Sequence, residues 1–555
     1  MNGIAVFLDM LAAAGIRHLF GNPGTTELPL NAALTGDDRF RYLFGVHEIP
    51  VIAMADGFAQ ASRSLGVTNV HISCGLGNAM GMIYNAFIAG TPLLITAGQQ
   101  DRRLRITEPV LDGDLVRVAR PWTKWAYEVQ RADDMAIAVR RAVQTALTPP
   151  TGPVFLSLPI DVQLEAVTQV DREPPHVPDC RTRPSTEAIE AAARMLLDAK
   201  NPAILAGSRV AESEAIAELV AVADRLGAAV FAEGNTSHGR LPFPTDHPLY
   251  RSVLPLWSPK IRDVLAPFDV LLIVGMNVMR LYIHAEPACP IPDHVQMIHL
   301  DCNPWEIGKN YPVEIGLVGD LKCGLRELEE RLTRGQSPAR QEEANARRNR
   351  WRDLRQAEQQ AIKDQVNKER DLRPMSPLIF MDALARVLPK DVAVVEEAVT
   401  THQNFLERTG ALPDALGFFA HRGWALGWGM GCAIGVKLAW PQRPVLAIIG
   451  DGAALYGIQA LWSAAHHRIP VTFVIANNRQ YSILKVCGDI LSLPSLRDPK
   501  CPGMNLVEPA IDYVGLAKAF GVDGVTVDDP DDLSDTVRES LKSERPLLIE
   551  VSIAR

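Results

Sequence analysis

The strongest constraint on the fold of this 555-residue chain is a pair of short apolar runs towards its C-terminus, each followed by polar residues. The first run ends in Gly450-Asp451-Gly452 and the second in Asn477-Asn478, with a helical pattern over Ala453–His467 between them. Two buried strands joined by a helix form a βαβ unit, whose right-handed crossover makes the strands parallel and close neighbours. We therefore expect Asp451 and Asn478 at the same carboxyl edge of a sheet, where open α/β sheets bind their ligands.

The residue types in this unit suit a magnesium ion and a diphosphate group. A carboxylate and an amide oxygen, completed by water and phosphate oxygens, match the octahedral oxygen coordination of Mg²⁺. Gly452 leaves the backbone free to approach a phosphate. Gly-Asp-Gly alone is a common turn and Asn-Asn often ends a strand, but the ordered pair around one helix favours a binding site. The sequence therefore predicts a magnesium–diphosphate site at Asp451 and Asn478.

Alternating strand and helix patterns divide the chain into three α/β segments, which predicts three doubly wound parallel-sheet domains. The expected limits are 1–170, 185–335, a charged helical linker over 336–372, and 373–555, with a Pro-rich, polar connection over Asp171–Pro184. The expected strands are His18–Gly21, Tyr42–Val46, Thr68–Ser73, Pro92–Ala97, Val154–Leu158, Pro202–Ala206, Ala228–Ala232, Val270–Val274, Met297–Leu300 and Leu547–Ile553. The first and third segments share an alternating βα plan, which is weak evidence of a duplication.

Composition and charge argue against several classes of protein. Hydrophobic residues make up 47% and charged residues 22% of the chain, as in ordinary globular proteins. The net charge of −9, with both signs interleaved over 336–372, argues against a nucleic-acid or anionic-membrane partner. No apolar run reaches membrane-spanning length, the N-terminus lacks the features of a signal peptide, and the eight cysteines include no C-x-x-C pair. We therefore expect a cytoplasmic protein with reduced thiols.

Three further features lie in the first segment. Glu48 is expected at the start of a helix with Pro50 in its first turn, where a carboxylate could simply complement the helix dipole. His71 lies in a predicted strand, and Gly75-Leu76-Gly77 follows as a glycine turn into a helix, which is typical of phosphate loops and of close-packed turns. Thr25, after an Asn-Pro-Gly turn, could cap a helix. Each feature alone favours a structural interpretation.

Taken together, these segments resemble the thiamine diphosphate (ThDP)-dependent 2-oxo acid decarboxylase and carboligase family, and within it the benzoylformate decarboxylase group. The resemblance extends over essentially the whole chain. It rests on the spacing of Gly-Asp-Gly and Asn-Asn and on five segments in the same order: Phe20–Gly24, Ala55–Ser62, Gly77–Met80, Thr96–Gln100 and Lys124–Glu128. It implies a pyrimidine-binding domain, a Rossmann-like middle domain and a diphosphate-binding domain, with ThDP and Mg²⁺ as cofactors.

The resemblance also implies roles for residues of the third segment. Asp451 and Asn478 would bind the metal, with the backbone carbonyl of Gln480 as the third protein ligand. Leu426 would be the bulky residue that bends ThDP, although without the resemblance it would be taken as an ordinary core leucine. A backbone carbonyl near Trp424 would receive the pyrimidine amine. The residues implied to contact the cofactor are Glu48, Trp424, Leu426, Gly452, Ala453, Asn478 and Tyr481.

For catalysis, the resemblance implies that Glu48 binds the pyrimidine ring and activates the cofactor for proton loss. His71 matches an active-site histidine of the family, and Thr25 lies where the benzoylformate decarboxylase group has a serine. A second acid–base group is expected at Tyr282 or His284. Tyr282 aligns best with the family position, whereas His284 has the more suitable ordinary pKa, so both remain candidates.

The expected reaction is the non-oxidative decarboxylation of a 2-oxo acid to an aldehyde and CO₂. The main alternative is a carboligase or C–C lyase of the acetohydroxyacid synthase or 2-hydroxyacyl-CoA lyase type, and a non-catalytic regulatory relative is the second. Ile483 replaces a small residue of the benzoylformate decarboxylase group, so the substrate stays open.

The resemblance also bears on assembly. In the family that the sequence resembles, the two domains that bind one cofactor belong to different subunits. Since Glu48 and Asp451 come from different domains, the resemblance implies at least a homodimer, with a homotetramer as the larger assembly. The expected partners are a small 2-oxo acid or aldehyde, with no nucleic acid and no membrane.

Overall fold

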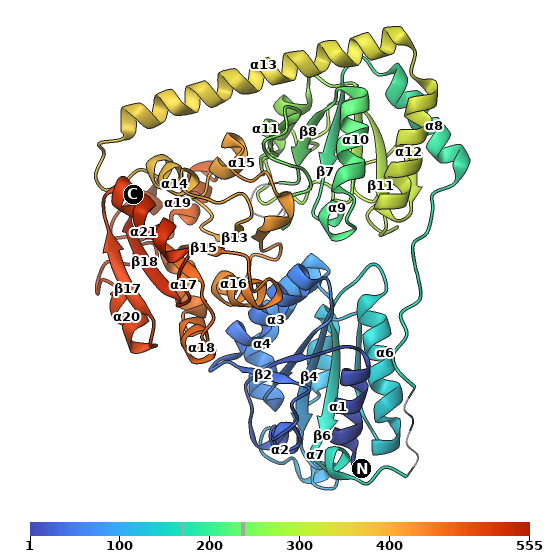
Figure 1. The fold of residues 1–555 in the computed structure, drawn as a ribbon, viewed down its shortest axis with the longest axis vertical. Helices are drawn as coiled ribbons and strands as arrows, with labels where there is room; N and C mark the ends of the chain where they lie inside the picture. Colours follow the sequence, from blue (N-terminus) through green and yellow to red (C-terminus); the bar gives the residue numbers. More distant parts are fainter. Residues whose placement is uncertain (169–170, 172, 235–238) are drawn as a thin grey trace.

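The fold consists of three parallel, six-stranded sheets, each surrounded by helices (Figure 1). It is described by a computed structural model for residues 1–168, 171, 173–234 and 239–555. The expected α/β class with three doubly wound sheets is confirmed. Residues 169, 170 and 172, near the expected end of the first segment and in the connection after it, and residues 235–238 in the second segment lie outside the described residues. We refer to the three sheets with their helices as the N-terminal, middle and C-terminal units.

The sheet of the N-terminal unit has the order β2-β1-β3-β4-β6-β5. Its strands are β1 His18–Gly21, β2 Arg41–Phe44, β3 Gly66–Val70, β4 Leu93–Gln99, β5 Trp125–Glu128 and β6 Val154–Pro159. Its helices are α1 Gly3–Ala13, α2 Leu28–Leu34, α3 Glu48–Ser62, α4 Ile72–Ala89, α5 Leu115–Ala119, α6 Met135–Leu147 and α7 Ile160–Leu164, with a 3-10 turn, η1, at Thr25–Glu27. Strand β5 was not predicted, because its half-buried residues at the sheet edge do not form an apolar run.

The sheet of the middle unit has the order β12-β11-β10-β7-β8-β9. Its strands are β7 Pro202–Ala206, β8 Ala229–Ala232, β9 Tyr250–Val253, β10 Val270–Val274, β11 Gln296–Asp301 and β12 Ile315–Val318. Its helices are α8 Thr186–Asp198, α9 Arg209–Glu212, α10 Ile216–Leu226, α11 Ser258–Leu265 and α12 Leu321–Gly335. The strand order reverses between β7 and β10, as in Rossmann-like sheets.

The sheet of the C-terminal unit has the order β14-β13-β15-β16-β18-β17. Its strands are β13 Ala393–Glu397, β14 Phe418–Ala420, β15 Val445–Gly450, β16 Thr472–Asn477, β17 Asp523–Val527 and β18 Leu547–Ser552. Its helices are α14 Pro377–Ala385, α15 Phe405–Thr409, α16 Trp428–Ala439, α17 Asp451–Gly457, α18 Ala460–His467, α19 Ser482–Ile490, α20 Tyr513–Ala519 and α21 Pro530–Ser540. Numbered within each unit, this strand order equals that of the N-terminal sheet, which supports the suggested duplication.

The N-terminal and C-terminal units are joined by helices α3 and α16, which share one apolar core. Glycines let the two backbones approach closely. A Cβ atom on Gly435 would lie 2.0 Å from the carbonyl oxygen of Met54, and one on Gly57 would lie 2.3 Å from that of Cys432. Because side chains are excluded from this crossing, the two helices hold the units in a fixed relation.

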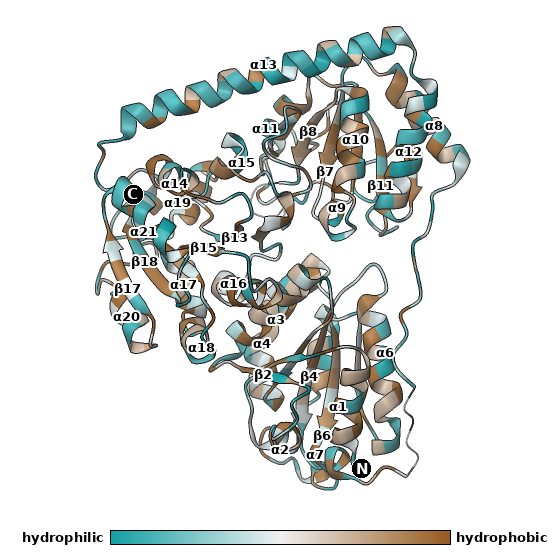
Figure 2. Ribbon diagram, in the orientation of Figure 1, coloured by the Kyte–Doolittle hydropathy of each residue, from teal (hydrophilic) through white to brown (hydrophobic). Residues whose placement is uncertain are grey.

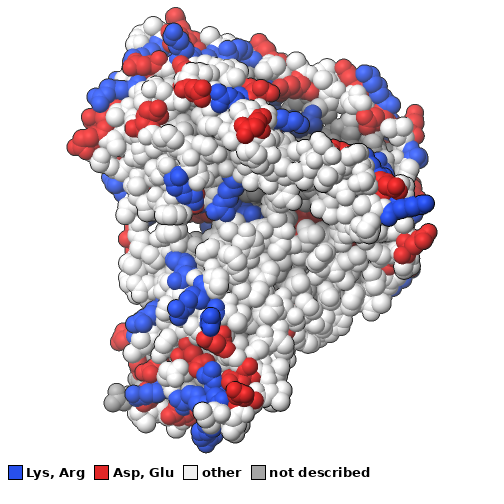
Figure 3. All heavy atoms as spheres, turned by 180° about the vertical axis from the view of Figure 1, so that it is seen from behind, with Lys and Arg blue, Asp and Glu red and all other residues white. Residues whose placement is uncertain are grey.

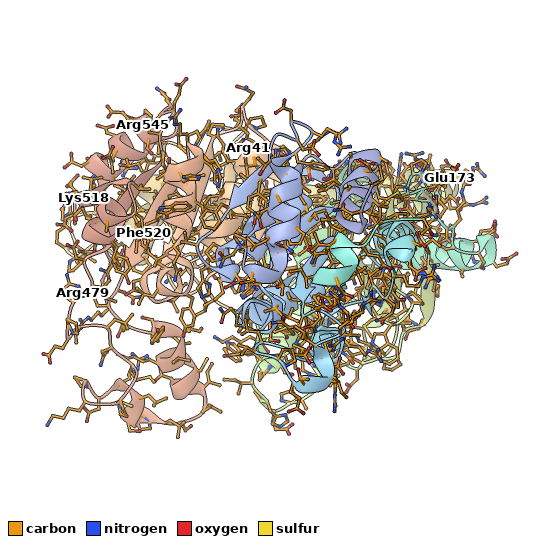
Figure 4. The ribbon with its side chains drawn as sticks, turned by 90° about the horizontal axis from the view of Figure 1, so that it is seen from below. Arg41, Glu173, Arg479, Lys518, Phe520 and Arg545 are labelled. Atoms are coloured by element: carbon orange, nitrogen blue, oxygen red, sulfur yellow. The ribbon has the colours of Figure 1, made fainter. Side chains whose placement is uncertain are left out.

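Two polar contacts reinforce the same junction. The indole Nε1 of Trp428 donates a buried hydrogen bond to Asp56 Oδ2 (2.7 Å). At the rim, Nη2 of Arg41 donates to the carbonyl oxygen of His467 (3.3 Å). Figure 4, seen from below, places Arg41 where the N-terminal and C-terminal units meet.

Helix α13, Pro338–Glu369, connects the middle and C-terminal units along one edge of the molecule (Figure 1). It is mostly hydrophilic (Figure 2), and charged side chains of both signs gather along this edge (Figure 3). The buried side chains of Trp351 and Ile362 anchor it, and Arg355 Nη1 donates to the carbonyl oxygen of Tyr250 (2.7 Å). Within the described ranges, no helix combines the length and apolar character needed to cross a lipid bilayer.

One local prediction is wrong near His71. Helix α4 begins at Ile72, and only His71 separates it from β3, so Gly75 and Gly77 lie inside a helix and do not form a glycine turn. Position 75 is a glycine because the helix backbone there lies close to the Glu48 side chain: a Cβ atom on Gly75 would lie 2.9 Å from Glu48 Oε1. This glycine therefore makes room for the Glu48 carboxylate.

The single helix expected over Ala453–His467 is also wrong, because the structure divides it into α17 and α18. The division follows Gly457, whose backbone lies against the turn that precedes α16. A Cβ atom on Gly457 would lie 2.3 Å from the carbonyl oxygen of Gly427.

Candidate active site

Strands β15 and β16 place two of the predicted metal ligands at one edge of the C-terminal sheet. The strands are parallel neighbours with Gly450 opposite Ala476. Asp451 begins α17 directly after β15, and Asn478 directly follows β16. The side chains of Asp451, Asn478 and Gln480 are all buried, and each residue is less than a tenth exposed. The carboxylate and the amide thus share one edge of the sheet, next to the backbone of Gln480.

The Asp451 carboxylate has one oxygen without a protein partner. Oδ1 accepts a hydrogen bond from the backbone N–H of Gly452 (2.9 Å), whereas Oδ2 is buried and makes no hydrogen bond with the described residues. Burial raises the pKa of this carboxyl to about 6, although the backbone N–H groups of Gly452, Arg479 and Gln480 oppose the shift. A buried carboxylate oxygen without a partner is costly, and a cation removes that cost. The residues present therefore fit an oxygen-liganded ion such as Mg²⁺.

Packing keeps the backbone beside Asp451 bare. A Cβ atom on Gly452 would lie 2.5 Å from the ring of Tyr481, so only glycine fits there. Ala453 follows in α17 and is 7% exposed. The Tyr513 hydroxyl donates to the carbonyl oxygen of Asp451 (2.8 Å), which fixes the first turn of α17.

Trp424 and Leu426 lie in the loop 421–427 between β14 and α16, which we call the Trp424 loop. Trp424 has a φ of 63°, in the left-handed region that bulky residues rarely adopt, so surrounding contacts must impose its conformation. At the end of the loop, the buried Glu397 carboxylate accepts hydrogen bonds of 2.9, 3.1 and 2.8 Å from three successive backbone N–H groups, those of Gly427, Trp428 and Gly429. Burial raises the pKa of Glu397 to about 8, although these hydrogen bonds oppose the shift.

Glu48, in the N-terminal unit, is the first residue of α3 and is 5% exposed. Its two carboxylate oxygens accept hydrogen bonds from different amides. Oε1 accepts from Asn22 Nδ2 (3.0 Å) and Oε2 from Asn78 Nδ2 (3.1 Å). These contacts and the bare backbone at Gly75 fix the orientation of the carboxylate, which a dipole-complementing role at a helix end would not need.

His71 lies immediately before α4 and pairs with a carboxylate that the sequence reasoning missed. Its Nδ1 is 2.7 Å from Oε2 of Glu27, which is 1% exposed. A neutral imidazole that donates from Nδ1 keeps Nε2 as its free acceptor. The turn that carries Thr25 packs directly on this ring, because a Cβ atom on Gly24 would lie 1.9 Å from His71 Nδ1. Thr25 itself is exposed, at the start of η1.

The structure separates the two candidates for the second acid–base group. The ring centroid of Tyr282 lies 4.5 Å from that of Trp424. Burial and the neighbouring Cys487 thiol raise the pKa of Tyr282. The His284 side chain, in contrast, is 74% exposed and pairs with Glu286, with 3.3 Å between Nε2 and Oε1. Of the two, only Tyr282 reaches the Trp424 loop.

Three protein-family models match successive parts of the chain. They are the N-terminal TPP (thiamine pyrophosphate) binding domain of thiamine pyrophosphate enzymes over residues 1–114, their central domain over 189–328 and their C-terminal TPP binding domain over 399–551. Together they cover most of the chain, and thiamine pyrophosphate is another name for ThDP. The chain belongs to the thiamine pyrophosphate enzyme family.

This thiamine pyrophosphate enzyme is similar to several relatives along its whole length. It is 33% identical to the benzoylformate decarboxylase of Pseudomonas aeruginosa, with 98% of this chain and 97% of that one covered. It is 28% identical to a probable acetolactate synthase large subunit of Methanocaldococcus jannaschii, with 100% and 92% covered. A solved structure, the ThDP-dependent 4-hydroxybenzoylformate decarboxylase of Rhodococcus jostii RHA1, matches with a TM-score of 0.85 at 29% identity, with 100% and 99% covered.

In this thiamine pyrophosphate enzyme the candidate residues form two separate groups. The N-terminal group contains Thr25, Glu27, Glu48 and His71, and the C-terminal group contains Asp451, Gly452, Asn478, Gln480 and Tyr481. Within the described part of one chain, no hydrogen bond, ion pair or ring contact joins a member of one group to a member of the other. The Trp424 loop lies between the units, because Asn85 of α4 hydrogen-bonds its backbone at Ala425.

Proposed function

We propose that this ThDP-dependent enzyme uses Mg²⁺ to decarboxylate a 2-oxo acid without oxidation, releasing an aldehyde and CO₂. The observation that carries the proposal is the His71–Glu27 pair in a chain that is 33% identical to a benzoylformate decarboxylase along 98% of its length. Decarboxylation through ThDP needs a group that exchanges protons with the bound substrate, and a histidine held by a buried carboxylate provides one.

The C-terminal group would hold the tail of the cofactor. Asp451 Oδ2, the side-chain oxygen of Asn478 and the backbone carbonyl of Gln480 would bind Mg²⁺, which would also neutralise the diphosphate. The bare backbone at Gly452, followed by Ala453 in α17, would face the phosphates, and Tyr481 would cover them from the other side.

The N-terminal group and the Trp424 loop would hold the head of the cofactor. Glu48, oriented by its two asparagine partners, would hydrogen-bond the pyrimidine ring. The carbonyl oxygen of Trp424 would accept a hydrogen bond from the pyrimidine amine, and Leu426 would keep the two rings of the cofactor in a bent arrangement. When bound, ThDP supplies the nucleophilic carbon and the electron sink that C–C cleavage requires.

The protein itself supplies the proton-transfer groups. The Glu27 carboxylate holds His71 through Nδ1, so Nε2 faces the substrate as acceptor or, once protonated, as donor. The hydroxyl of Thr25, on the turn that packs against His71, would hydrogen-bond the substrate carboxylate. Tyr282, which lies against Trp424, is the second acid–base group in this proposal, in preference to His284.

The separation of the two groups supports a site between subunits, and hence at least a homodimer, with a homotetramer as the larger assembly. Exposed apolar side chains offer contact surface in both units. Ile106 and Val110 of the N-terminal unit are 90 and 80% exposed, and Leu491 of the C-terminal unit is 52% exposed. Figure 3 shows a broad face with few charged side chains, as a surface between copies requires.

The remaining features support a cytoplasmic enzyme with three domains. All eight cysteines are free thiols, which suits a reducing compartment. The proposed domain limits are 1–170, 185–335 and 373–555, with α13 in the linker 336–372.

One observation favours a second candidate activity, carboligation or C–C lysis. The chain is 28% identical, along its whole length, to a probable acetolactate synthase large subunit. A single assay separates the two reactions. Holoenzyme is incubated with aromatic and aliphatic 2-oxo acids, with and without added aldehydes, while CO₂, free aldehyde and ligation products are measured together.

We expect stoichiometric CO₂ and aldehyde from at least one 2-oxo acid without any acceptor, and no reaction with the Glu48→Gln variant. Product formation only when an aldehyde acceptor is present would favour the carboligase. Absence of CO₂ from every 2-oxo acid in the panel would contradict decarboxylation.

A further inference from the structure

The Trp424 loop is held by side chains from all three units. From the N-terminal unit, Asn85 in α4 clamps Ala425: Nδ2 donates to its carbonyl oxygen (2.8 Å), and Oδ1 accepts from its N–H (3.1 Å). From the C-terminal unit, Glu397 holds the backbone at the end of the loop. The middle unit contributes the ring of Tyr282 and a charged contact at the beginning of the loop.

This charged contact is a buried ion pair between Glu233 and Arg422. Glu233 directly follows β8, and Arg422 lies two residues after β14 ends. Nη2 of Arg422 donates to both carboxylate oxygens of Glu233 (3.1 and 3.0 Å), and the two side chains are only 2% and 6% exposed. Parting the two segments would separate two desolvated, hydrogen-bonded charges, so the contact resists such a movement.

The pair is one end of a network along the carboxyl edge of the middle sheet. Glu233 Oε1 also accepts from the backbone N–H of Asn277 (3.2 Å). Asn277 Oδ1 accepts from Nη1 of Arg209 (2.8 Å), and Nε of Arg209 donates to Oδ1 of the fully buried Asp301 (3.0 Å). The network connects the ends of β8, β10 and β11, so Arg422 is tied to the rigid part of the middle sheet.

We propose that Glu233 and Arg422 are positioning residues that hold the Trp424 loop in the conformation that binds the pyrimidine end of ThDP. Arg422 lies two residues before Trp424, whose φ of 63° needs an external restraint. With Arg422 fixed on one side of Trp424 and Ala425 clamped on the other, the residue cannot relax to a negative φ. The inference rests on the proposed function, because it takes the role of this loop in ThDP binding from there.

The middle unit therefore acts on the cofactor site through an ion pair that need not touch the cofactor. The ThDP dissociation constant and the turnover number at saturating ThDP should therefore respond differently to loss of the pair. Loss of the pair allows the loop to relax, which lowers the affinity for ThDP, whereas the catalytic groups Glu48 and His71 keep their own partners. Saturating ThDP should then restore most of the turnover.

The test measures the dissociation constant of ThDP by tryptophan fluorescence and by calorimetry at saturating Mg²⁺, with the apoprotein melting temperature as a check of folding. Glu233→Gln removes the charge and keeps the side-chain size. We expect its ThDP dissociation constant to rise at least about tenfold, with kcat at saturating ThDP within about threefold of the parent.

Glu358→Gln is the matched control. It breaks the ion pair between Glu358 and Arg251 (2.6 Å). Arg251 also belongs to the middle unit, but this ion pair does not include a residue of the Trp424 loop. We expect its ThDP dissociation constant to stay within about twofold of the parent. Arg422→Lys keeps the positive charge but has a less directional donor. If Glu233→Gln does not fold, the same measurements are made on Arg422→Lys, with the same expected rise in the ThDP dissociation constant.

A folded Glu233→Gln or Arg422→Lys variant with parental ThDP affinity would overturn the proposal, and so would an equal loss of affinity in Glu358→Gln. A parent protein that does not bind ThDP at all is a different result. It would overturn the proposed function, and this inference with it.

Discussion

The carboxyl group of Asp451 makes the stability of the protein depend on pH. Its pKa is raised to about 6 by burial, whereas the unfolded value is about 3.9. The folded state therefore binds this proton more tightly than the unfolded chain. The group costs nothing well below about pH 4, its cost to the free energy of folding grows as the pH rises from about 4 to about 6, and above that the cost is constant.

Asp451→Asn removes this cost together with the proposed metal ligand. At about pH 7.5, without Mg²⁺ and ThDP, we expect the variant to melt about 2–5 °C above the parent, and at about pH 4.5 we expect the difference to be about a third as large. Adding Mg²⁺ with ThDP should raise the melting temperature of the parent and leave that of the variant unchanged. Differential scanning calorimetry measures the melting temperatures of both proteins under all three conditions. A variant that still responds to Mg²⁺ would contradict the assignment of Asp451 as a metal ligand.

Glu27 is the residue whose substitution should separate proton transfer from cofactor binding. It accepts from His71 Nδ1 and from the backbone N–H groups of Gly24 (3.0 Å) and Gly98 (2.7 Å). In Glu27→Gln an uncharged amide replaces the carboxylate that orients the imidazole. We expect kcat to fall about 100-fold, with the ThDP dissociation constant within about twofold of the parent.

Asp56→Asn is the control for Glu27→Gln, since it also converts a buried carboxylate to an amide in the N-terminal unit, at a hydrogen bond with Trp428. It should lower the melting temperature and leave kcat within about twofold of the parent. Unchanged kcat in Glu27→Gln would show that His71 does not need its carboxylate partner.

At the residue scale, the sequence could suggest candidate site residues but not the contacts that hold each side chain. Asp451 and Asn478 could be paired because each directly follows an apolar run that forms a buried parallel strand. Glu27 carried no comparable signal, since its nearest sequence context, Thr25-Thr26, suggested only a helix cap. Tyr282 could not be preferred over His284, because exposure and ring contacts depend on packing between units.

At the element scale, several buried strands could be predicted closely, and β1 and β7 begin and end where their apolar runs do, whereas the buried strands β13 and β14 were not predicted. The roles of the glycines were the least predictable feature, because each glycine is required by a contact with a residue distant in the sequence. Gly75 faces Glu48, and Gly435 faces Met54 across the α3–α16 crossing. A local glycine rule assigns such positions to turns, whereas the structure uses them for close approach inside helices.

The α3–α16 crossing can be tested with a single methyl group. Gly435→Ala places a Cβ atom 2.0 Å from the carbonyl oxygen of Met54, so one helix must shift. We expect a loss of about 3 kcal/mol in the free energy of unfolding, measured by urea denaturation of the apoprotein. In the control, Gly81→Ala in α4, the new Cβ atom lies 3.5 Å from that of Ala425, an ordinary contact. This variant should be as stable as the parent or more stable by about 0.5 kcal/mol. Equal stability of the two variants would contradict the role of the crossing.

At the scale of the whole molecule, the N-terminal and C-terminal sheets have the same strand order, and each carries one of the two groups of candidate site residues. The middle unit contacts the Trp424 loop, which lies between them, through the Glu233–Arg422 pair. The number of sheets and their class followed from periodicity, because each strand and helix pattern is local. The Glu233–Arg422 pair could not be predicted from the sequence, since its partners are 189 residues apart and neither lies in a recognisable motif. Contacts between units are therefore where the structure adds most to the sequence.

The separation between the N-terminal and C-terminal groups of candidate residues predicts that two variants, each inactive alone, restore activity when mixed. Glu48→Gln removes the proposed pyrimidine partner and Asp451→Asn the proposed metal ligand, and the structure shows no hydrogen bond or ion pair between the two residues within one chain. If each site combines the N-terminal group of one subunit with the C-terminal group of the other, a mixed dimer contains one site with both residues intact and one with neither. Random reassortment of equal amounts makes half the dimers mixed, so about a quarter of the parental activity should return. The measurement is CO₂ release after the two variants are mixed, dissociated by mild denaturant and reassembled, with each variant treated alone as the control. If both groups of a site came from a single chain, the mixture would stay as inactive as its components.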